Sequence, residues 1–217
     1  MNEMNFFKVK DKYSALTHLI GFLLSLIATP ILLIRAASHQ VSMRILVTLA
    51  IFMATMVLLY GASTTYHSFH LERKKELILK RIDHISIFYL IAGSYTPLCL
   101  GVFYPETRHL GISIWLLAIV GTVFKMFWVT CPKWVSSILY LGMGWISVLL
   151  IPMIRNQFGR MAFFWLLLGG IFYSIGAYLY ALKKPLGTKE FGNHEIFHVL
   201  VMLGSLCHYL LMFYFVA

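Results

Sequence analysis

The chain has 217 residues, of which 60% are hydrophobic and only 12% are charged. Its mean hydropathy of +0.81 excludes an ordinary soluble domain, because a soluble domain of this length does not need so much apolar surface. The formal net charge of +10 would indicate a nucleic-acid-binding protein if the chain were soluble. Here the basic residues lie in loops and at segment ends, where they fit contact with anionic lipid headgroups, so we expect no nucleic-acid partner.

Long apolar segments follow one another through short loops, and each has the length that a tilted transmembrane helix needs. No linker or low-complexity tract divides them. We therefore predict an all-α, polytopic protein of the cell membrane, folded as a seven-transmembrane-helix bundle in a single domain, residues 1–217. Residues 1–13 form a segment before the first span. The predicted spans are 14–36, 41–66, 82–103, 109–130, 134–154, 160–182 and 194–216.

Basic residues are distributed unevenly between the two sides of this predicted bundle. Of the 18 Lys and Arg residues, the side of the amino terminus holds most and the opposite side holds few. Because positively charged loops stay in the cytoplasm, we expect a cytoplasmic amino terminus and an extracytoplasmic carboxyl terminus. The amino-terminal side holds Lys8, Lys10, Lys12, Arg73, Lys74, Lys75, Lys80, Arg81, Lys133, Lys183, Lys184 and Lys189, and the opposite side holds Arg35, Arg44, Arg108, Arg155 and Arg160.

Two histidines, His194 and His198, stand at the start of the last predicted span. Residues four apart lie on one face of a helix, one turn apart, and at this spacing both imidazoles can bind one metal ion. His67, at the cytoplasmic end of the second span, reaches the same membrane level and is the natural third ligand, with His70 as a competitor. Neutral imidazole suits Zn²⁺, and three protein ligands leave a fourth position for water, as in catalytic zinc sites.

Two further polar residues reach this level. Ser63 lies one turn deeper than His67 on the same helix face, and Asp83 stands at the start of the third span. A carboxylate at this depth needs a partner, such as a metal-bound water, an imidazole or a basic side chain. We expect Asp83 to transfer protons and Ser63 to orient water or stabilise an oxyanion. Ser14 and His18, in the first span, are expected to line the same cavity.

The sequence His194-Glu195-Ile196-Phe197-His198 also matches the signature of zinc proteases, in which the glutamate is the general base. An intramembrane metalloprotease is therefore an alternative. No later apolar segment supplies the further acidic ligand of such an enzyme. The simpler interpretation of Glu195 is a carboxylate at the cytoplasmic rim, close to the positive end of the last helix, where negative charge is favourable.

Three sets of residues form motifs: Ser63-x3-His67, Arg81-Ile82-Asp83-His84 with Gly93-Ser94-Tyr95-Thr96-Pro97, and His194-x3-His198 followed by His208. Together these motifs resemble the hemolysin III family, which is grouped with the progestin and adipoQ (adiponectin) receptors and with seven-helix membrane hydrolases related to alkaline ceramidases. The resemblance covers nearly the whole chain. It implies seven helices with the amino terminus inside, and possible hydrolysis of a lipid amide. It also implies that zinc is held by His67, His194 and His198, with Ser63 and Asp83 close to the metal or its water.

The leading hypothesis is a zinc-dependent hydrolase of an amide or ester bond in a lipid substrate. One alternative is a non-enzymatic sensor or receptor-like regulator of membrane lipid state, in which zinc is structural and ties helices together. Another is a pore-forming cytolysin, as the family name implies, although no span has the charged amphipathic face that would line a wide channel. Membrane lipids are the expected partners.

Overall fold

The structure is a computed structural model that describes residues 9–182, 184, 186–188 and 191–217. Residues 1–8, and Lys183 and Lys189 from the charge pattern, lie outside the described residues. Every regular element in the described part is a helix. The elements are α1 (Lys12–Ser38), α2 (Met43–Ser68), α3 (Arg73–Thr96), a π-helical turn η1 (Pro97–Val102), α4 (Arg108–Phe127), α5 (Lys133–Trp145), a 3-10 turn η2 (Ile146–Leu150), α6 (Ile151–Ala181) and α7 (Asn193–Phe215).

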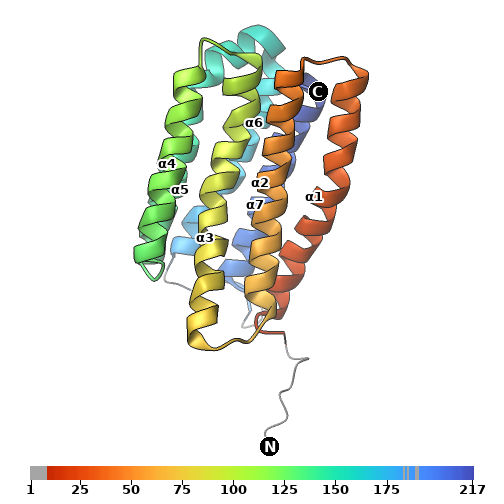
Figure 1. Ribbon diagram of the computed structural model, residues 1–217. Coiled ribbons are helices and arrows are strands. Elements are labelled where there is room, and N and C mark those ends of the chain that lie inside the picture. Colours follow the sequence, from red (N-terminus) through yellow and green to blue (C-terminus); the bar gives the residue numbers. More distant parts are fainter. Residues whose placement is uncertain (1–8, 183, 185, 189–190) are drawn as a thin grey trace, which may run out of the picture.

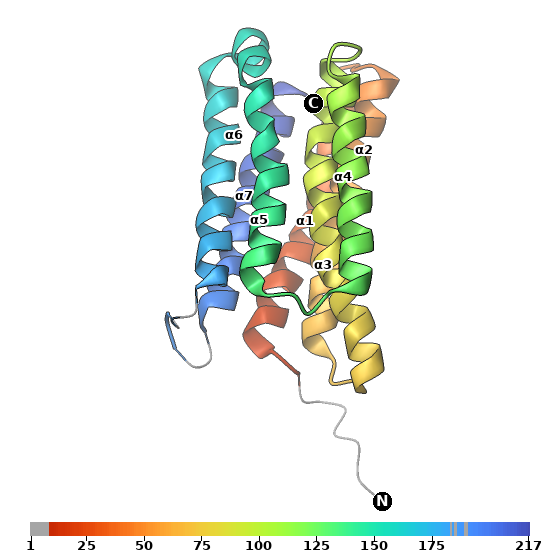
Figure 2. The ribbon, with the colours of Figure 1, turned by 90° about the vertical axis from the view of Figure 1, so that its left-hand side faces the viewer.

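Helices that follow one another in the chain pack side by side, and α7 packs against α1, which closes the bundle into a ring. The helices run roughly parallel or antiparallel to one another and surround a common interior (Figure 1). Figure 2, turned by 90°, shows α5 and α6 side by side on one flank. We call the end of the bundle at which α1 begins the proximal end; the carboxyl terminus lies at the opposite, distal end (Figure 1). Because α2 ends and α7 begins proximally, their terminal turns meet there.

The outer surface of the bundle is apolar. Side chains such as Ile34, Phe127 and Leu149 are 68%, 86% and 67% exposed. A surface of this kind is unfavourable in water and suits a lipid environment, where helices satisfy their own backbone hydrogen bonds. Among the described residues, 6 helices are long and apolar enough to cross a membrane, with Lys133–Ala181 counted as a single 49-residue helix. The predicted all-α membrane fold is confirmed, whereas seven separate crossings and their orientation stay predictions.

Helix bounds differ from the predicted spans in two places. The third helix begins at Arg73, well before the predicted span at 82. Lys, Glu, Leu and Arg are good helix formers, so the helix continues into a polar segment that a hydropathy pattern does not detect. The fifth predicted span, 134–154, extends past the end of α5 at Trp145 and into the start of α6 at Ile151. The predicted gap after it, 155–159, lies inside α6, which is interrupted at Gly159, where φ is 80°. Glycine adopts this backbone conformation without the steric penalty of a Cβ atom.

Close packing joins α1 to α2 and α7, the two helices that carry the candidate metal ligands. A Cβ atom at Gly21 of α1 would lie 2.8 Å from the ring of Tyr60 in α2, so the two helices approach closely only because this residue is glycine. The buried Tyr60 hydroxyl donates a hydrogen bond of 2.8 Å to Ser205 in α7. These contacts fix α1, α2 and α7 relative to one another near the middle of the bundle.

Candidate metal centre

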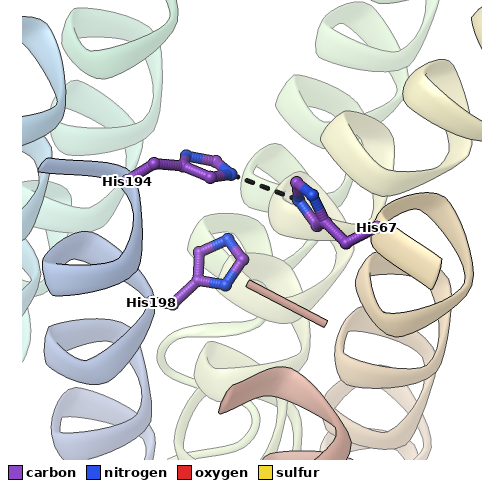
Figure 3. Close-up of side chains that lie close together, drawn as sticks. All are labelled: His67, His194 and His198. Carbon is purple, nitrogen blue, oxygen red and sulfur yellow. Dashed lines mark hydrogen bonds between the residues drawn. The ribbon is translucent and has the colours of Figure 1, made fainter. Parts of the chain in front are cut away.

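Three histidines converge at the proximal end of the bundle. His67 lies in the last turn of α2, His194 in the first turn of α7, and His198 one turn further along α7. Figure 3 shows the three rings facing a common point between the two helices. His67 and His198 are 3% and 2% exposed, so their imidazoles are almost fully removed from solvent. His70 is exposed beyond the end of α2 and is not part of the cluster.

The spacing of these rings brings three ligand atoms within reach of one metal ion. One nitrogen from each histidine lies within 4.8 Å of the others, and no other group of this kind exists in the described part of the chain. The Nε2 atoms of His67 and His194 are 3.2 Å apart (Figure 3). Two nitrogens that each bind zinc at about 2.0–2.1 Å in tetrahedral geometry lie about 3.3 Å apart. The three-histidine set can therefore hold an ion, and its donor chemistry favours zinc.

Hydrogen bonds at the outer nitrogens define which atoms of two rings face inward. His67 Nδ1 lies 2.9 Å from the Asp11 carboxylate, and His198 Nδ1 lies 3.3 Å from the Ser14 carbonyl oxygen. Both partners only accept hydrogen bonds, so each Nδ1 carries the proton. In the neutral imidazole, Nε2 then has a free lone pair. This is the tautomer that a metal ligand needs.

Glu195 does not face the point between the three histidines. One carboxylate oxygen accepts a 2.9 Å hydrogen bond from the backbone N–H of Gly192, just before α7 begins, and the other accepts one from the Ser14 hydroxyl. Glu195 therefore caps the positive end of α7 and ties it to α1. Because both oxygens are occupied in this way, the arrangement matches the rim-carboxylate interpretation and does not present Glu195 as a general base.

A cavity begins at the histidines and continues along the bundle interior. Asp83 and Ser63 line it beside His194 and His198, and Asp83 is only 9% exposed. Asp83 lies outside the group of three potential ligands. The Ser63 hydroxyl lies near the Asp83 carboxylate, yet it has no hydrogen-bond partner of acceptable geometry among the described residues. A buried hydroxyl of this kind is available to a water molecule or a substrate.

The cavity is long and mostly apolar. Its volume is about 150 Å³, far more than the ~10–15 Å³ that one water molecule requires. It reaches from His194 to Met212 on α7, a distance of roughly 27 Å along the helix at 1.5 Å per residue. Between these two residues the wall is built mainly from aliphatic and aromatic side chains, including Leu59, Ile91, Leu98, Phe163, Leu167 and Val201.

Other histidines singled out in the sequence also line this cavity. The His18 ring stacks on the His198 ring, with centroids 3.6 Å apart, and neither His18 nitrogen has a hydrogen-bond partner among the described residues. His84 has a partnerless Nδ1, while its backbone carbonyl accepts a hydrogen bond from Tyr140. His208, ten residues beyond His198, lies about 15 Å further along α7 and is too distant to share a metal ion.

Two polar features at this end were not predicted. Asp11 immediately precedes α1, and Thr17 lies one turn into it, with its hydroxyl 3.2 Å from His198 Nδ1. The only signal in the sequence is an acidic residue before an apolar segment, which usually marks a helix cap. The second feature is Lys125, which is fully buried and donates hydrogen bonds to Ser136 at 2.6 Å and to the Cys131 sulfur at 3.2 Å.

Comparison with known proteins identifies the family of this chain. The family described as "Haemolysin-III related" matches residues 6–209. The chain belongs to this family. It is 39% identical over 205 residues to the "Hemolysin-3 homolog" of Bacillus subtilis (strain 168), covering 92% of this chain and 91% of that protein. It is 38% identical over 208 residues to "Hemolysin-3" of Bacillus cereus, covering 94% and 91%.

More distant similarity extends to animal receptors. The chain is 26% identical over 212 residues to the "Progestin and adipoQ receptor-like protein 1" of Caenorhabditis elegans, covering 89% of this chain but only 49% of that protein. Members of the haemolysin-III-related family and these receptor-like relatives are integral membrane proteins, and so is this chain. The family resemblance drawn from the motifs is thereby confirmed.

Proposed function

We propose that this haemolysin-III-related protein is a zinc-dependent membrane hydrolase that cleaves an amide or ester bond in a lipid. The observation that carries the proposal is the convergence of His67, His194 and His198 at the proximal end of the bundle, where His194 and His198 line a long apolar cavity. A three-histidine site leaves a coordination position for a reactant. Asp83 and Ser63 lie in the same cavity, where they can act on whatever occupies it.

The residues present fit zinc. All three candidate ligands are imidazoles, and the hydrogen bonds at Nδ1 of His67 and His198 leave their Nε2 lone pairs facing inward. Zinc held by three imidazoles supplies a Lewis acid that polarises a carbonyl and lowers the pKa of a bound water to about 7. The protein's own groups must then move the proton and hold the substrate.

Asp83 is the group that we propose moves the proton. Its buried carboxylate can accept a proton from the attacking water and return it to the leaving amine or alcohol. The Ser63 hydroxyl, which has no partner in the described structure, can donate to the oxygen on which negative charge develops. His18, with both nitrogens unpaired, can orient the polar end of the substrate.

A lipid is the substrate class that best fits the cavity. The apolar wall removes acyl-chain methylene groups from water or from bulk lipid, while the polar groups lie together at the proximal end. A lipid whose scissile bond is close to its headgroup would place that bond at the histidines and its chain along the interior. In this arrangement no charged group of the lipid substrate lies deep in the bilayer.

We also propose that all seven α-helices cross the membrane and that the proximal end faces the cytoplasm. The antiparallel pair α5 and α6 lie side by side (Figure 2), and the 49 residues Lys133–Ala181 that hold them and η2 are enough for two crossings of about 20 residues each. Among the described residues, the loops and helix ends at the proximal end carry most of the basic side chains, which favours cytoplasmic placement. They include Lys10, Arg73, Lys74, Lys75, Lys133 and Lys184.

The decisive experiment measures hydrolysis of a panel of lipid amides and esters by the purified protein, with zinc content measured in parallel. Asp83→Asn should retain zinc and lose turnover by about 10²–10⁴-fold, the usual contribution of a general acid–base group. Glu106→Gln, an exposed carboxylate-to-amide change at the distal end, should leave both quantities unchanged. Unchanged turnover in Asp83→Asn would remove Asp83 from the mechanism.

The same preparation separates the two alternative functions. A sensor with structural zinc would contain stoichiometric metal and lose thermal stability on chelation, but would hydrolyse nothing in the panel. The name of the Bacillus cereus relative, "Hemolysin-3", raises the cytolysin alternative. An aqueous pore needs a polar lining, whereas this cavity is mostly apolar. Conductance in protein-containing liposomes that survives loss of the histidines would favour the cytolysin.

A further inference from the structure

The segment from Lys10 to Thr17, here called the amino-terminal arm, lies against two of the three candidate metal ligands. Asp11 contacts His67, and Ser14 and Thr17 contact His198. His67 belongs to α2 and His198 to α7, so the arm reaches ligands from both helices. The sequence predicted only that Ser14 of this arm lines the cavity; the contacts of Asp11 and Thr17 with the candidate ligands were not predicted, and the role of the arm goes beyond the ligand set itself.

Asp11 forms an unusual contact for a residue at its position. It precedes α1 as the N-cap residue, where an aspartate normally accepts a hydrogen bond from a backbone N–H of the first turn. Here the side chain makes no such bond, and the carboxylate instead accepts the Nδ1 proton of His67 at 2.9 Å. The Asp11 side chain thus bonds to a histidine on a neighbouring helix and does not cap α1.

The backbone and the preceding residue hold Asp11 in this position. Its N–H donates to the carbonyl of His67 at 2.9 Å, and the N–H of Lys10 donates to the carbonyl of Ser68 at 3.3 Å. Lys10 Nζ lies 2.6 Å from a Glu76 carboxylate oxygen and 3.8 Å above the Tyr66 ring. Burial disfavours the ammonium form of Lys10, but these contacts outweigh it, so the pKa of Lys10 lies above its ordinary value. Lys10 is therefore charged at neutral pH, and its contacts with Glu76 and Tyr66 are retained there.

The second ligand contact comes from the first turns of α1. Thr17 Oγ1 donates to a backbone carbonyl one turn earlier, that of Tyr13 or Ser14, each at 3.0 Å. Its remaining lone pair can accept from His198 Nδ1 at 3.2 Å, in addition to the Ser14 carbonyl at 3.3 Å. His198 thus has two neutral acceptors, whereas His67 has one anionic acceptor.

We propose that the amino-terminal arm is the outer coordination shell of the metal centre, with Asp11 as the positioning residue for His67. The proposal rests on the metal centre of the proposed function but does not depend on hydrolysis. A carboxylate bonded to Nδ1 fixes the tautomer and ring orientation of a ligand histidine and raises its basicity. The side chain of Asp11 is 43% exposed, so a mutation there perturbs the ligand with little disturbance of packing.

The test uses the full-length protein, freed of metal and titrated with Co²⁺, whose visible absorption reports tetrahedral coordination, and then with Zn²⁺ in competition. Asp11→Ala should weaken metal binding about 10–100-fold, the usual effect of losing such a partner. Asp11→Asn should be intermediate, because the amide oxygen still accepts the Nδ1 proton. Thr17→Val should have a smaller effect than Asp11→Ala, because the Ser14 carbonyl remains.

Glu72→Ala is the matched control, since Glu72 is an exposed N-cap residue at the same end with no side-chain cap hydrogen bond. It should bind metal as the wild type does. Equal affinity in Asp11→Ala and wild type, with a lower melting temperature of the metal-free variant, would reduce the arm to a structural clamp and overturn the proposal. A wild-type protein that takes up no metal would overturn both proposals. If metal binding depends on Asp11 and the protein hydrolyses no lipid, the proposed role of the amino-terminal arm is supported and only the proposed hydrolase function is contradicted.

Discussion

The Nε2 atoms of His67 and His194 lie 3.2 Å apart, although 127 residues separate them in the chain. One residue ends α2 and the other begins α7, so their meeting depends on two helices that reach the same end of the bundle. Imidazole nitrogens at this separation either share a proton or bind a common cation. Two of the three histidines also have outer partners that leave Nε2 unprotonated, the form in which an imidazole binds a metal ion.

Metal content should depend on all three histidines and on no others. Removal of any ligand leaves two, so His67→Ala, His194→Ala and His198→Ala should each fall from about one zinc per chain to well below half. His70→Ala is the control, because His70 is close in sequence yet exposed and outside the cluster. Metal analysis of the four purified variants checks this. Loss of metal in His70→Ala with retention in His67→Ala would reverse the assignment.

Ser63→Ala should separate stability from activity. The buried Ser63 hydroxyl lies near the Asp83 carboxylate but makes no hydrogen bond of acceptable geometry among the described residues, so its removal should change the melting temperature little. Loss of a donor to a developing oxyanion should lower turnover by roughly 10²–10³-fold.

Ser25→Ala provides the comparison for that variant. Ser25 is also a buried serine, but its hydroxyl donates to the Phe22 carbonyl within α1. We expect it to keep full turnover of the same lipid. If Ser63→Ala destabilises the protein and keeps its turnover, Ser63 has a structural role only.

Gly21→Ala should destabilise the bundle next to the site. The new Cβ atom would lie 2.8 Å from the buried Tyr60 ring, which cannot move freely because its hydroxyl is bonded to Ser205. Overpacking of this kind costs about 1–3 kcal/mol. Gly142→Ala should be neutral or stabilising, because no atom lies within 4 Å of its Cβ position. Thermal unfolding in one detergent compares the two; equal melting temperatures would show that α1 and α2 adjust their spacing.

Membrane topology can be read from single engineered cysteines, because Cys99, Cys131 and Cys207 are all buried. Glu72→Cys lies at the proximal end and Asn156→Cys in the distal part of α6, both exposed. An impermeant thiol reagent added to intact cells should label only Asn156→Cys, and Glu72→Cys should react after the membrane is opened. Labelling of both positions from the same side would contradict seven separate crossings.

The sequence alone was sufficient for the membrane class, the all-α fold and the family. These depend on apolar segments of membrane-spanning length and on residues at fixed short spacings, both of which are local properties of the chain. The same local reasoning placed His194 beside His198, because helical geometry fixes residues four apart. It also selected His67 over His70, and the structure brings His67 into the cluster.

Only the tertiary structure could show the contacts that surround these residues. Asp11 reads in the sequence as a helix cap, and its bond to His67 exists because α1 packs against α2 with its first residues level with the last turn of α2. The hydrogen bond from the Ser14 hydroxyl to Glu195 likewise depends on the approach of α1 to α7. Hydrogen bonds between helices far apart in sequence are set by packing, which no local pattern encodes.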